Sequence, residues 1–207
     1  MFRDRQDAAS QLADALKTYQ GKKPLILAVP RGAVPMAKPI AERLGGEFDV
    51  VLVRKLRAPW QSELAIGSID ESGWTYIAPF AASMGVDDDY LAQEKQTQLE
   101  TIRKRRAQYT PIRAPIDPTG RIVIVIDDGL ATGATMISAL HGLRNRKPAR
   151  LICAVPVAPP DTLEKVRKMT DEVVCLQAPE LFQAVSQFYG HFNQVEDDEV
   201  IALLRAG

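Results

Sequence analysis

Histidine and cysteine are scarce in this chain of 207 residues, which contains two of each. Cys153 and Cys175 both lie in apolar segments. Neither they nor His141 and His191 show the spacing of zinc ligands or of a nucleophile with its base. We therefore expect the cysteines to be reduced, buried thiols in strands.

An excess of charge of either sign is also missing, because 26 basic residues balance 26 acidic ones. Such a chain has no general attraction for nucleic acid or an anionic membrane, so any basic chemistry must be local. The first ten residues lack the apolar core of a secretory signal. No apolar run approaches the roughly 20 residues of a membrane span. These absences predict a soluble, cytoplasmic protein.

The composition is that of a globular domain, with 46% hydrophobic and 25% charged residues. The length fits a single domain over residues 1–207. Asp4 is a suitable N-cap for a first helix. Continuous apolar segments, typical of strands buried on both faces, alternate further on with helical patterns. The strands are expected at 25–29, 49–53, 121–126, 151–155 and 172–176, and the helices between them at 34–44, 134–146 and 161–169. This alternation predicts an α/β fold with an open, parallel, five-stranded sheet flanked by helices.

Two parts of the chain interrupt this alternation. Residues 56–110 are too long for a simple crossover and contain an expected hairpin (65–69 and 74–78) and a charged helix (87–109). The basic cluster 103–106 in that helix could touch nucleic acid, but we favour a solvated helix face. The tail, residues 179–207, is expected to form two short helices.

The segment RIVIVIDDGLATGATMISAL, residues 121–140, carries the most information. An expected strand ends in Asp127 and Asp128, and a loop of small residues then leads into a helix near Gly133. Ligands of open α/β sheets bind beyond the carboxyl ends of the strands. Backbone N–H groups at this helix start, with the hydroxyls of Thr132 and Thr135, would bind an anion. Paired carboxylates can accept hydrogen bonds from neighbouring hydroxyls or bind a hydrated divalent cation. Together these groups describe a site for ribose 5-phosphate, although an ordinary strand–turn–helix with capping carboxylates is the alternative.

This segment is neither a Walker A loop nor a Gly-x-Gly-x-x-Gly motif. It resembles the signature of type I phosphoribosyltransferases, except that a larger apolar residue is usual at Gly129. The resemblance implies Mg²⁺, held by Asp127 and Asp128 through water, and a homodimer. It also implies that 5-phosphoribosyl 1-pyrophosphate is bound by Asp127, Asp128, Gly129, Leu130, Ala131, Thr132, Gly133, Ala134 and Thr135.

Two further segments match the order of parts in that family. The resemblance implies that Arg31 and Gly32, in AVPRGAVP, belong to a pyrophosphate loop. It places Arg54 and Lys55, in RKLR, at the same pyrophosphate. Alone, these residues would be interpreted as a tight turn and a solvated basic patch. In the family a variable segment, the hood, covers the base, and the hood is expected here in the tail from residue 178 onward, together with the first helix.

The acceptor base is not determined by the motif. Enzymes for hypoxanthine and guanine usually hold an aspartate where this chain has Ala131, which argues against 6-oxopurines. Adenine enzymes carry a glutamate in a mobile loop, and Glu63 in SELAIG occupies a comparable place. Glu63 is therefore the candidate for proton transfer, with an exposed loop glutamate as the alternative. We expect residues 57–64 to close over the ligand.

Two functions follow from the resemblance. The first is transfer of ribose 5-phosphate from 5-phosphoribosyl 1-pyrophosphate to a small nitrogenous base, with Glu63, Arg31 and Lys55 as catalytic residues. The second is a catalytically silent regulatory protein that binds the same ligand or a nucleotide. Some such proteins bind RNA or DNA, which the neutral net charge disfavours here. The whole pattern is similar to a bacterial branch whose members often carry only the family's name.

Overall fold

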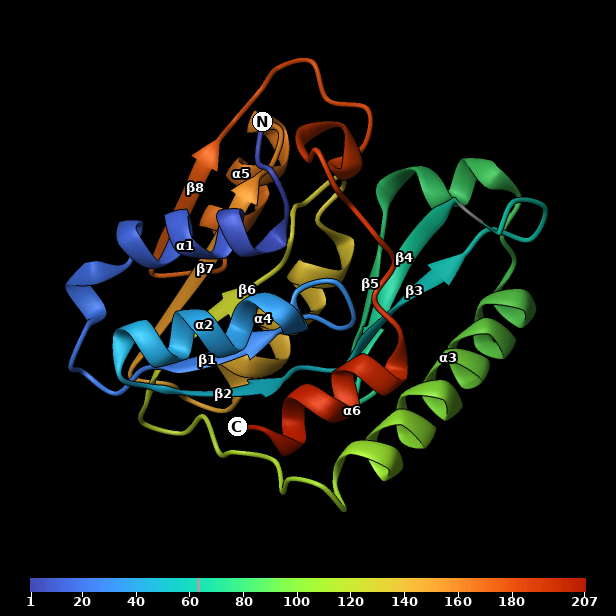
Figure 1. The fold of residues 1–207 in the computed structure, drawn as a ribbon. Coiled ribbons are helices and arrows are strands. Elements are labelled where there is room, and N and C mark those ends of the chain that lie inside the picture. The colour runs from blue at the N-terminus through green and yellow to red at the C-terminus, as the bar shows by residue number, and fades with distance from the viewer. Residues whose placement is uncertain (63) are drawn as a thin grey trace.

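The computed structural model describes residues 1–62 and 64–207 (Figure 1). At its centre lies a parallel five-stranded sheet with the order β2-β1-β6-β7-β8. This confirms the open parallel sheet expected from the sequence. The strands are β1 (Leu25–Ala28), β2 (Glu47–Val50), β6 (Ile122–Ile126), β7 (Arg150–Val157) and β8 (Glu172–Gln177).

Helices cover both faces of this sheet. Ile26 of β1 packs in a core with residues of α1 (Arg5–Ala15) and α2 (Val34–Leu44). Its neighbours Leu25 and Leu27 point to the opposite face and pack with residues of α4 (Ala134–Asn145) and α5 (Pro160–Arg167). A strand buried on both faces needs apolar residues at every position. This requirement explains the continuous apolar segments of the sequence.

A second, antiparallel sheet contains β3 (Val53–Arg57), β4 (Ala65–Asp70) and β5 (Thr75–Ile77). The predicted hairpin is confirmed as β4 and β5. The predicted strand 49–53 is wrong at its end, because β2 stops at Val50 and Val53 begins β3 in the other sheet. Both Val50 and Val53 are buried, so an unbroken apolar run conceals the change of sheet.

The long helix α3 (Asp88–Tyr109) lies against β3 and β4, beside the small sheet (Figure 1). The expectation of a solvated face at 103–106 holds for Arg103 and Lys104, which are exposed. It is wrong for Arg105 and Arg106, whose side chains are only 17% and 20% exposed. Because α3 packs against the sheet, one face of its basic cluster turns inward.

The N-terminal residues pair with a segment of the tail that precedes α6 (Asp197–Arg205). Phe2 N–H donates to the carbonyl of Phe188, and Gly190 N–H donates to the carbonyl of Phe2. We call this pairing of residues 2–3 with 188–191 the terminal clasp. The tail contains the expected short helices, a 3₁₀ turn (Val185–Phe188) and α6 (Asp197–Arg205). Further 3₁₀ turns cover Lys17–Tyr19 and Pro79–Met84.

Both cysteines are free thiols in strands, and Cys153 in β7 is buried, as expected. The expectation of burial is wrong for Cys175, which is only half-buried because β8 is the edge strand of the sheet. Burial raises the pKa of each thiol above its ordinary value. Within the described part of the chain, no helix is both long enough and apolar enough to cross a membrane.

Candidate functional site

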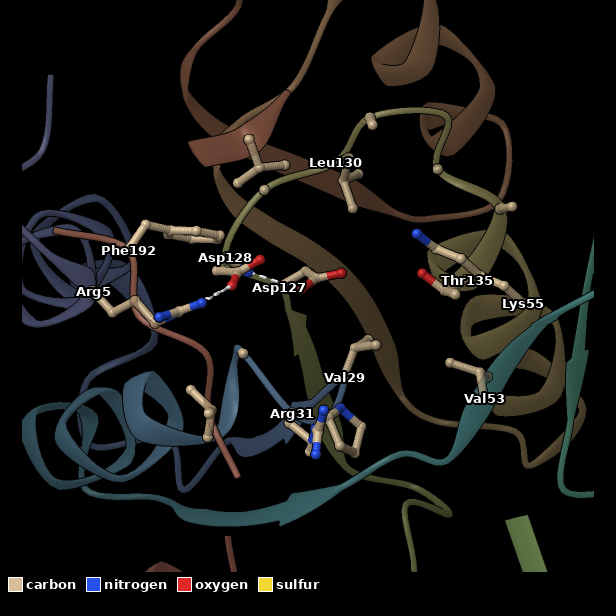
Figure 2. A pocket seen from close by; sticks show the side chains of 18 of the residues that line it. Arg5, Val29, Arg31, Val53, Lys55, Asp127, Asp128, Leu130, Thr135 and Phe192 are labelled. Atoms are coloured by element: carbon tan, nitrogen blue, oxygen red, sulfur yellow. Dashed lines mark hydrogen bonds and ion pairs between the residues drawn. The ribbon is translucent and has the colours of Figure 1, made fainter. Parts of the chain in front are cut away.

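A cavity of about 530 Å³ opens beyond the carboxyl ends of β1 and β6 (Figure 2). The chain leaves β1 toward β2 on one side and β6 toward β7 on the other, so this is the switch point of the sheet, where open α/β folds bind ligands. Arg31, Gly32, Lys55 and the whole segment 127–135 line the cavity. The structure thus brings together three predicted segments that are far apart in sequence.

The loop before α4 is built to present backbone N–H groups. Gly133 is the N-cap, with a φ of +78° that favours glycine, and it offers no side chain to cap the helix. The Thr132 hydroxyl accepts from the N–H of Ala134 at the long distance of 3.5 Å. Leu130 N–H donates to the carbonyl of Val157, and the Thr162 hydroxyl donates to the carbonyl of Ala131. These two bonds hold the loop in place. The start of the helix can therefore receive an anion.

The paired carboxylates differ in their surroundings. Burial and the adjacent Asp128 raise the pKa of Asp127 well above its ordinary value, and Lys55 opposes this rise. Asp128 instead accepts two hydrogen bonds at Oδ2, from Nε and Nη2 of Arg5, at 3.0 and 2.9 Å (Figure 2). The protein itself thus compensates the charge of Asp128, whereas Asp127 faces the cavity.

Arg5 is a site residue that the sequence reasoning missed. Its guanidinium lies 4.0 Å from the centre of the Phe192 ring, and its Nη1 donates to the carbonyl of Asn193 at 2.6 Å. It stands on the first turn of α1, 123 residues before Asp128. No motif or spacing in the sequence relates these positions. Arg5 and Phe192 lie on the side of the cavity opposite Lys55 and Thr135 (Figure 2), and Val185 also lines the cavity.

The carboxylate pair fits a magnesium ion. Mg²⁺ is usually held by one or two carboxylates together with waters and substrate phosphates. In the described residues no three His, Cys, Asp or Glu side chains gather into a cage made of protein ligands alone. Asp127 and Asp128 beside the anion loop therefore suit an ion that a phosphate ligand shares.

The segment 30–33 approaches the carboxylates closely. The peptide bond between Pro30 and Arg31 is cis. A Cβ on Gly32 would lie 2.1 Å from Oδ2 of Asp128, so a larger residue there would push the Asp128 carboxylate out of its place against Arg5. Arg31 lines the cavity and also pairs with Glu196, the N-cap of α6, at 3.3 Å.

The remaining predicted cations occupy different places. Lys55 reaches the cavity and makes no ion pair with any carboxylate that the structure describes. Arg54 does not line this cavity. Its Nε donates to Oε1 of Gln98 at 3.0 Å, and its side chain lines an adjoining cavity. Glu63 lies outside the described residues.

Gly129 stands where the motif usually has a larger apolar residue, and the packing of the tail explains the glycine. A Cβ there would lie 2.6 Å from Cγ1 of Val185 and 3.0 Å from Cγ1 of Val157. The tail thus fills the space that a larger residue of the motif usually takes. Gly129→Ala should lower the free energy of unfolding by about 1–3 kcal/mol, as overpacking does. Urea unfolding will measure it.

The matched test of this packing is a double-mutant cycle. Val185→Ala removes the nearer clash, so Gly129→Ala should cost less in the Val185→Ala background than in the wild type. Equal costs in both backgrounds would show that Val185 does not explain the glycine.

Arg5→Ala should also destabilise the protein. Hydrogen bonds to charged groups contribute about 1.5–3 kcal/mol, and the Arg5 and Asp128 side chains are only 12% and 13% exposed. Arg5→Lys should recover part of the loss, because it keeps the charge but not the two-pronged geometry. Arg3→Ala, at a side chain 84% exposed, is the control and should change little. Denaturant unfolding of the three variants measures their stabilities, and Arg5→Ala should be the least stable of them.

Comparison with known proteins agrees with this geometry. Residues 2–192 match the family model of the phosphoribosyl transferase domain. The chain is 40% identical over 206 residues to "Putative phosphoribosyl transferase Rv0571c" of Mycobacterium tuberculosis, covering 99% of this chain but 46% of that protein. It thus spans about half the length of that relative.

Two further relatives differ in how closely they match. The uracil phosphoribosyltransferase of Mycoplasma genitalium is 28% identical over 178 residues, 83% of this chain and 77% of its own. The crystal structure of TT1426 from Thermus thermophilus superposes with a TM-score of 0.82 at 41% identity, covering 99% of this chain and 98% of that one. From the matched domain, these relatives and the site at the switch point, we conclude that the chain belongs to the type I phosphoribosyltransferase family.

Proposed function

We propose that this chain transfers ribose 5-phosphate from 5-phosphoribosyl 1-pyrophosphate to a nitrogenous base and releases pyrophosphate. The observation that carries the proposal is the arrangement of one cavity. The start of α4, a carboxylate pair and the cations Arg31 and Lys55 line it. These groups match the 5-phosphate, the ribose hydroxyls and the pyrophosphate of this one ligand.

In this proposal, the backbone N–H groups of residues 131–135 bind the 5-phosphate. Asp127 and the free oxygen of Asp128 accept hydrogen bonds from the ribose hydroxyls. Arg31 and Lys55 meet the charge that develops on the departing pyrophosphate. The same carboxylates stabilise the positive charge of an oxocarbenium-like sugar during the transfer.

Asp127 and Asp128 would hold Mg²⁺ through water. The ion would neutralise pyrophosphate charge as the bond to the sugar breaks. Chelation tests the contribution of the ion. Removal of Mg²⁺ should abolish tight binding of 5-phosphoribosyl 1-pyrophosphate, and restoring the ion should recover that binding.

The acceptor would face the wall made by Leu130, Val185 and Phe192, since the other sides of the cavity are assigned to phosphate, sugar and pyrophosphate. Ala131 argues against a 6-oxopurine, because it cannot exchange a proton with the base. Glu63 is the proposed proton-transfer residue. We also propose a cytoplasmic homodimer, and light scattering after gel filtration tests the dimer.

The decisive experiment measures pyrophosphate release from 5-phosphoribosyl 1-pyrophosphate with Mg²⁺ and a panel of purine, pyrimidine and pyridine bases. Release with one base supports the transferase. Tight binding of the sugar ligand without release for any base would instead favour the regulatory binding protein. No binding of the sugar ligand would contradict both functions.

A further inference from the structure

A further cavity, of about 520 Å³, lies on the side of the large sheet that α4 covers. Its walls come from β1, the end of β2, the turn after β4, the chain between α3 and β6, and α4. We call this space, which Leu27, Asp70 and Leu143 line, the hairpin cavity. Among the described residues, none lines both the hairpin cavity and the cavity of Asp127 and Asp128. A ligand of the hairpin cavity would therefore leave the proposed transferase site free.

Asp70, at the end of β4, has one carboxylate oxygen with hydrogen-bond donors and one without. Its Oδ1 accepts hydrogen bonds from the N–H and the hydroxyl of Ser72, at 2.9 and 2.6 Å, and from the N–H of Trp74 at 3.0 Å. These bonds hold the turn between β4 and β5. Its Oδ2 is buried and has no hydrogen-bond partner among the residues that the structure describes, and the whole residue is only 5% exposed. A buried carboxylate oxygen without a donor is unfavourable, which indicates a donor that the chain itself does not supply.

Gly142 of α4 keeps the space in front of this oxygen open. A Cβ on Gly142 would lie 2.8 Å from Oδ2 of Asp70, and both residues line the hairpin cavity. Gly142 lies inside the helix, where glycine costs about 0.5–1 kcal/mol relative to alanine, so helix formation does not favour it. The glycine instead leaves room for a donor group beside Oδ2.

The other charged groups of the hairpin cavity are already paired. Nε and Nη2 of Arg106 donate to the two carboxylate oxygens of Glu71, at 2.8 and 2.7 Å. Arg146 pairs with Asp117, which lies outside the cavity, at 3.1 Å. Both oxygens of Asp49 accept hydrogen bonds from backbone N–H groups, at 2.8 and 2.9 Å. The carboxylate with the open oxygen is thus the group of this cavity whose charge a ligand can neutralise.

We propose that the hairpin cavity binds a small organic cation, an amine with an apolar body, whose nitrogen donates to Oδ2 of Asp70. The buried side chains of Leu27, Leu52 and Leu143 offer walls for the apolar body. A volume of about 520 Å³ lies within the range of small-molecule sites, which are mostly apolar with a few polar groups. In the described residues no three His, Cys, Asp or Glu side chains gather into a metal site, and an anion would be repelled by the open carboxylate. Binding of the amine would not require the proposed transfer reaction.

The test titrates the protein with benzylamine, phenethylamine and tryptamine, which increase in size, and with the matching uncharged alcohols. Ligand-observed NMR measures the affinities at neutral pH, where alkylamines are protonated. At least one amine should bind the wild type more tightly than its alcohol, by about 10-fold or more. Asp70→Asn keeps an oxygen for the turn but loses the charge. It should weaken binding of that amine about 10- to 100-fold, the range for one hydrogen bond to a charged group, and leave the alcohol nearly unchanged.

Two further variants make the result specific to this oxygen. Gly142→Ala places a methyl group in front of Oδ2 and should also weaken binding of the amine. Asp89→Asn makes the same chemical change as Asp70→Asn at an exposed carboxylate that lines neither cavity, and it should leave the affinities unchanged. Circular dichroism checks that each variant is folded.

Equal affinities of each amine and its alcohol, or no binding of any amine to the wild type, would overturn the proposal. Amine binding that persists in folded Asp70→Asn but is lost in Asp127→Asn would also overturn it, because the amine would then occupy the cavity of the carboxylate pair. If Asp70→Asn does not fold, Gly142→Ala decides alone, and an unchanged amine affinity in that variant contradicts the site.

Discussion

Asp127→Asn combined with Asp128→Asn should weaken binding of 5-phosphoribosyl 1-pyrophosphate in the presence of Mg²⁺ by about two to four orders of magnitude. Each carboxylate is proposed to accept a hydrogen bond from the ribose, and such a bond to a charged group contributes about 1.5–3 kcal/mol. Loss of both negative charges also removes the proposed attachment of Mg²⁺. Titration calorimetry with and without the ion measures the effect.

The single variants separate binding from folding. Asp127→Asn leaves the pair between Arg5 and Asp128 intact, so it should keep the wild-type stability while losing much of the affinity. Asp117→Asn, at a side chain 67% exposed and remote from the cavity, is the matched control. Unchanged affinity in the folded double variant would refute the ribose assignment of this carboxylate pair.

Glu63→Gln should lower turnover by about 10²- to 10⁴-fold on whichever base proves active, the usual contribution of a general acid or base. Its affinity for 5-phosphoribosyl 1-pyrophosphate should stay nearly intact, because the carboxylates and the anion loop are assigned to that ligand. The expectation arises by elimination: Ala131 carries no titratable group, and Asp127 and Asp128 are assigned to the ribose. Steady-state kinetics and calorimetry on the same preparation measure both quantities.

Glu71→Gln is the control for this substitution, since Glu71 pairs with Arg106 and does not line the cavity that contains Asp127 and Asp128. Wild-type turnover in Glu63→Gln would exclude Glu63 from the reaction. Attention would then move to Glu196, which accepts a hydrogen bond from Nη1 of Arg31 at 3.3 Å.

The parts of the site that could be predicted from sequence are those encoded by contiguous residues. The strand, the two carboxylates and the loop at 127–135 occupy one short segment, so their relative geometry follows from a strand-to-helix turn. Arg31 and Gly32 are likewise fixed by the turn after β1. The buried strands were recognisable because a parallel sheet with helices on both faces demands uninterrupted apolar residues.

What could not be predicted depends on contacts between distant segments. Arg5 looks like any charged residue in a first helical turn until the fold places it against Asp128. Val185 gives no sign of why position 129 is glycine. Arg103 and Arg105 are chemically alike, and only the packing of α3 on β3 turns the second toward a cavity. The change of sheet between Val50 and Val53 is hidden because both environments are apolar.

The terminal clasp also governs when the pocket is completed during translation. Phe2 and Arg5 leave the ribosome long before their partners Phe188, Tyr189 and Phe192, which are synthesised only after the last strand, β8. Contacts between residues so far apart in sequence form late and slowly. Until residue 192 emerges, Phe2 has no tail residue to pack against and Asp128 lacks the Tyr189 hydroxyl that donates to its carbonyl. A nascent chain with every strand made would therefore still lack a finished pocket.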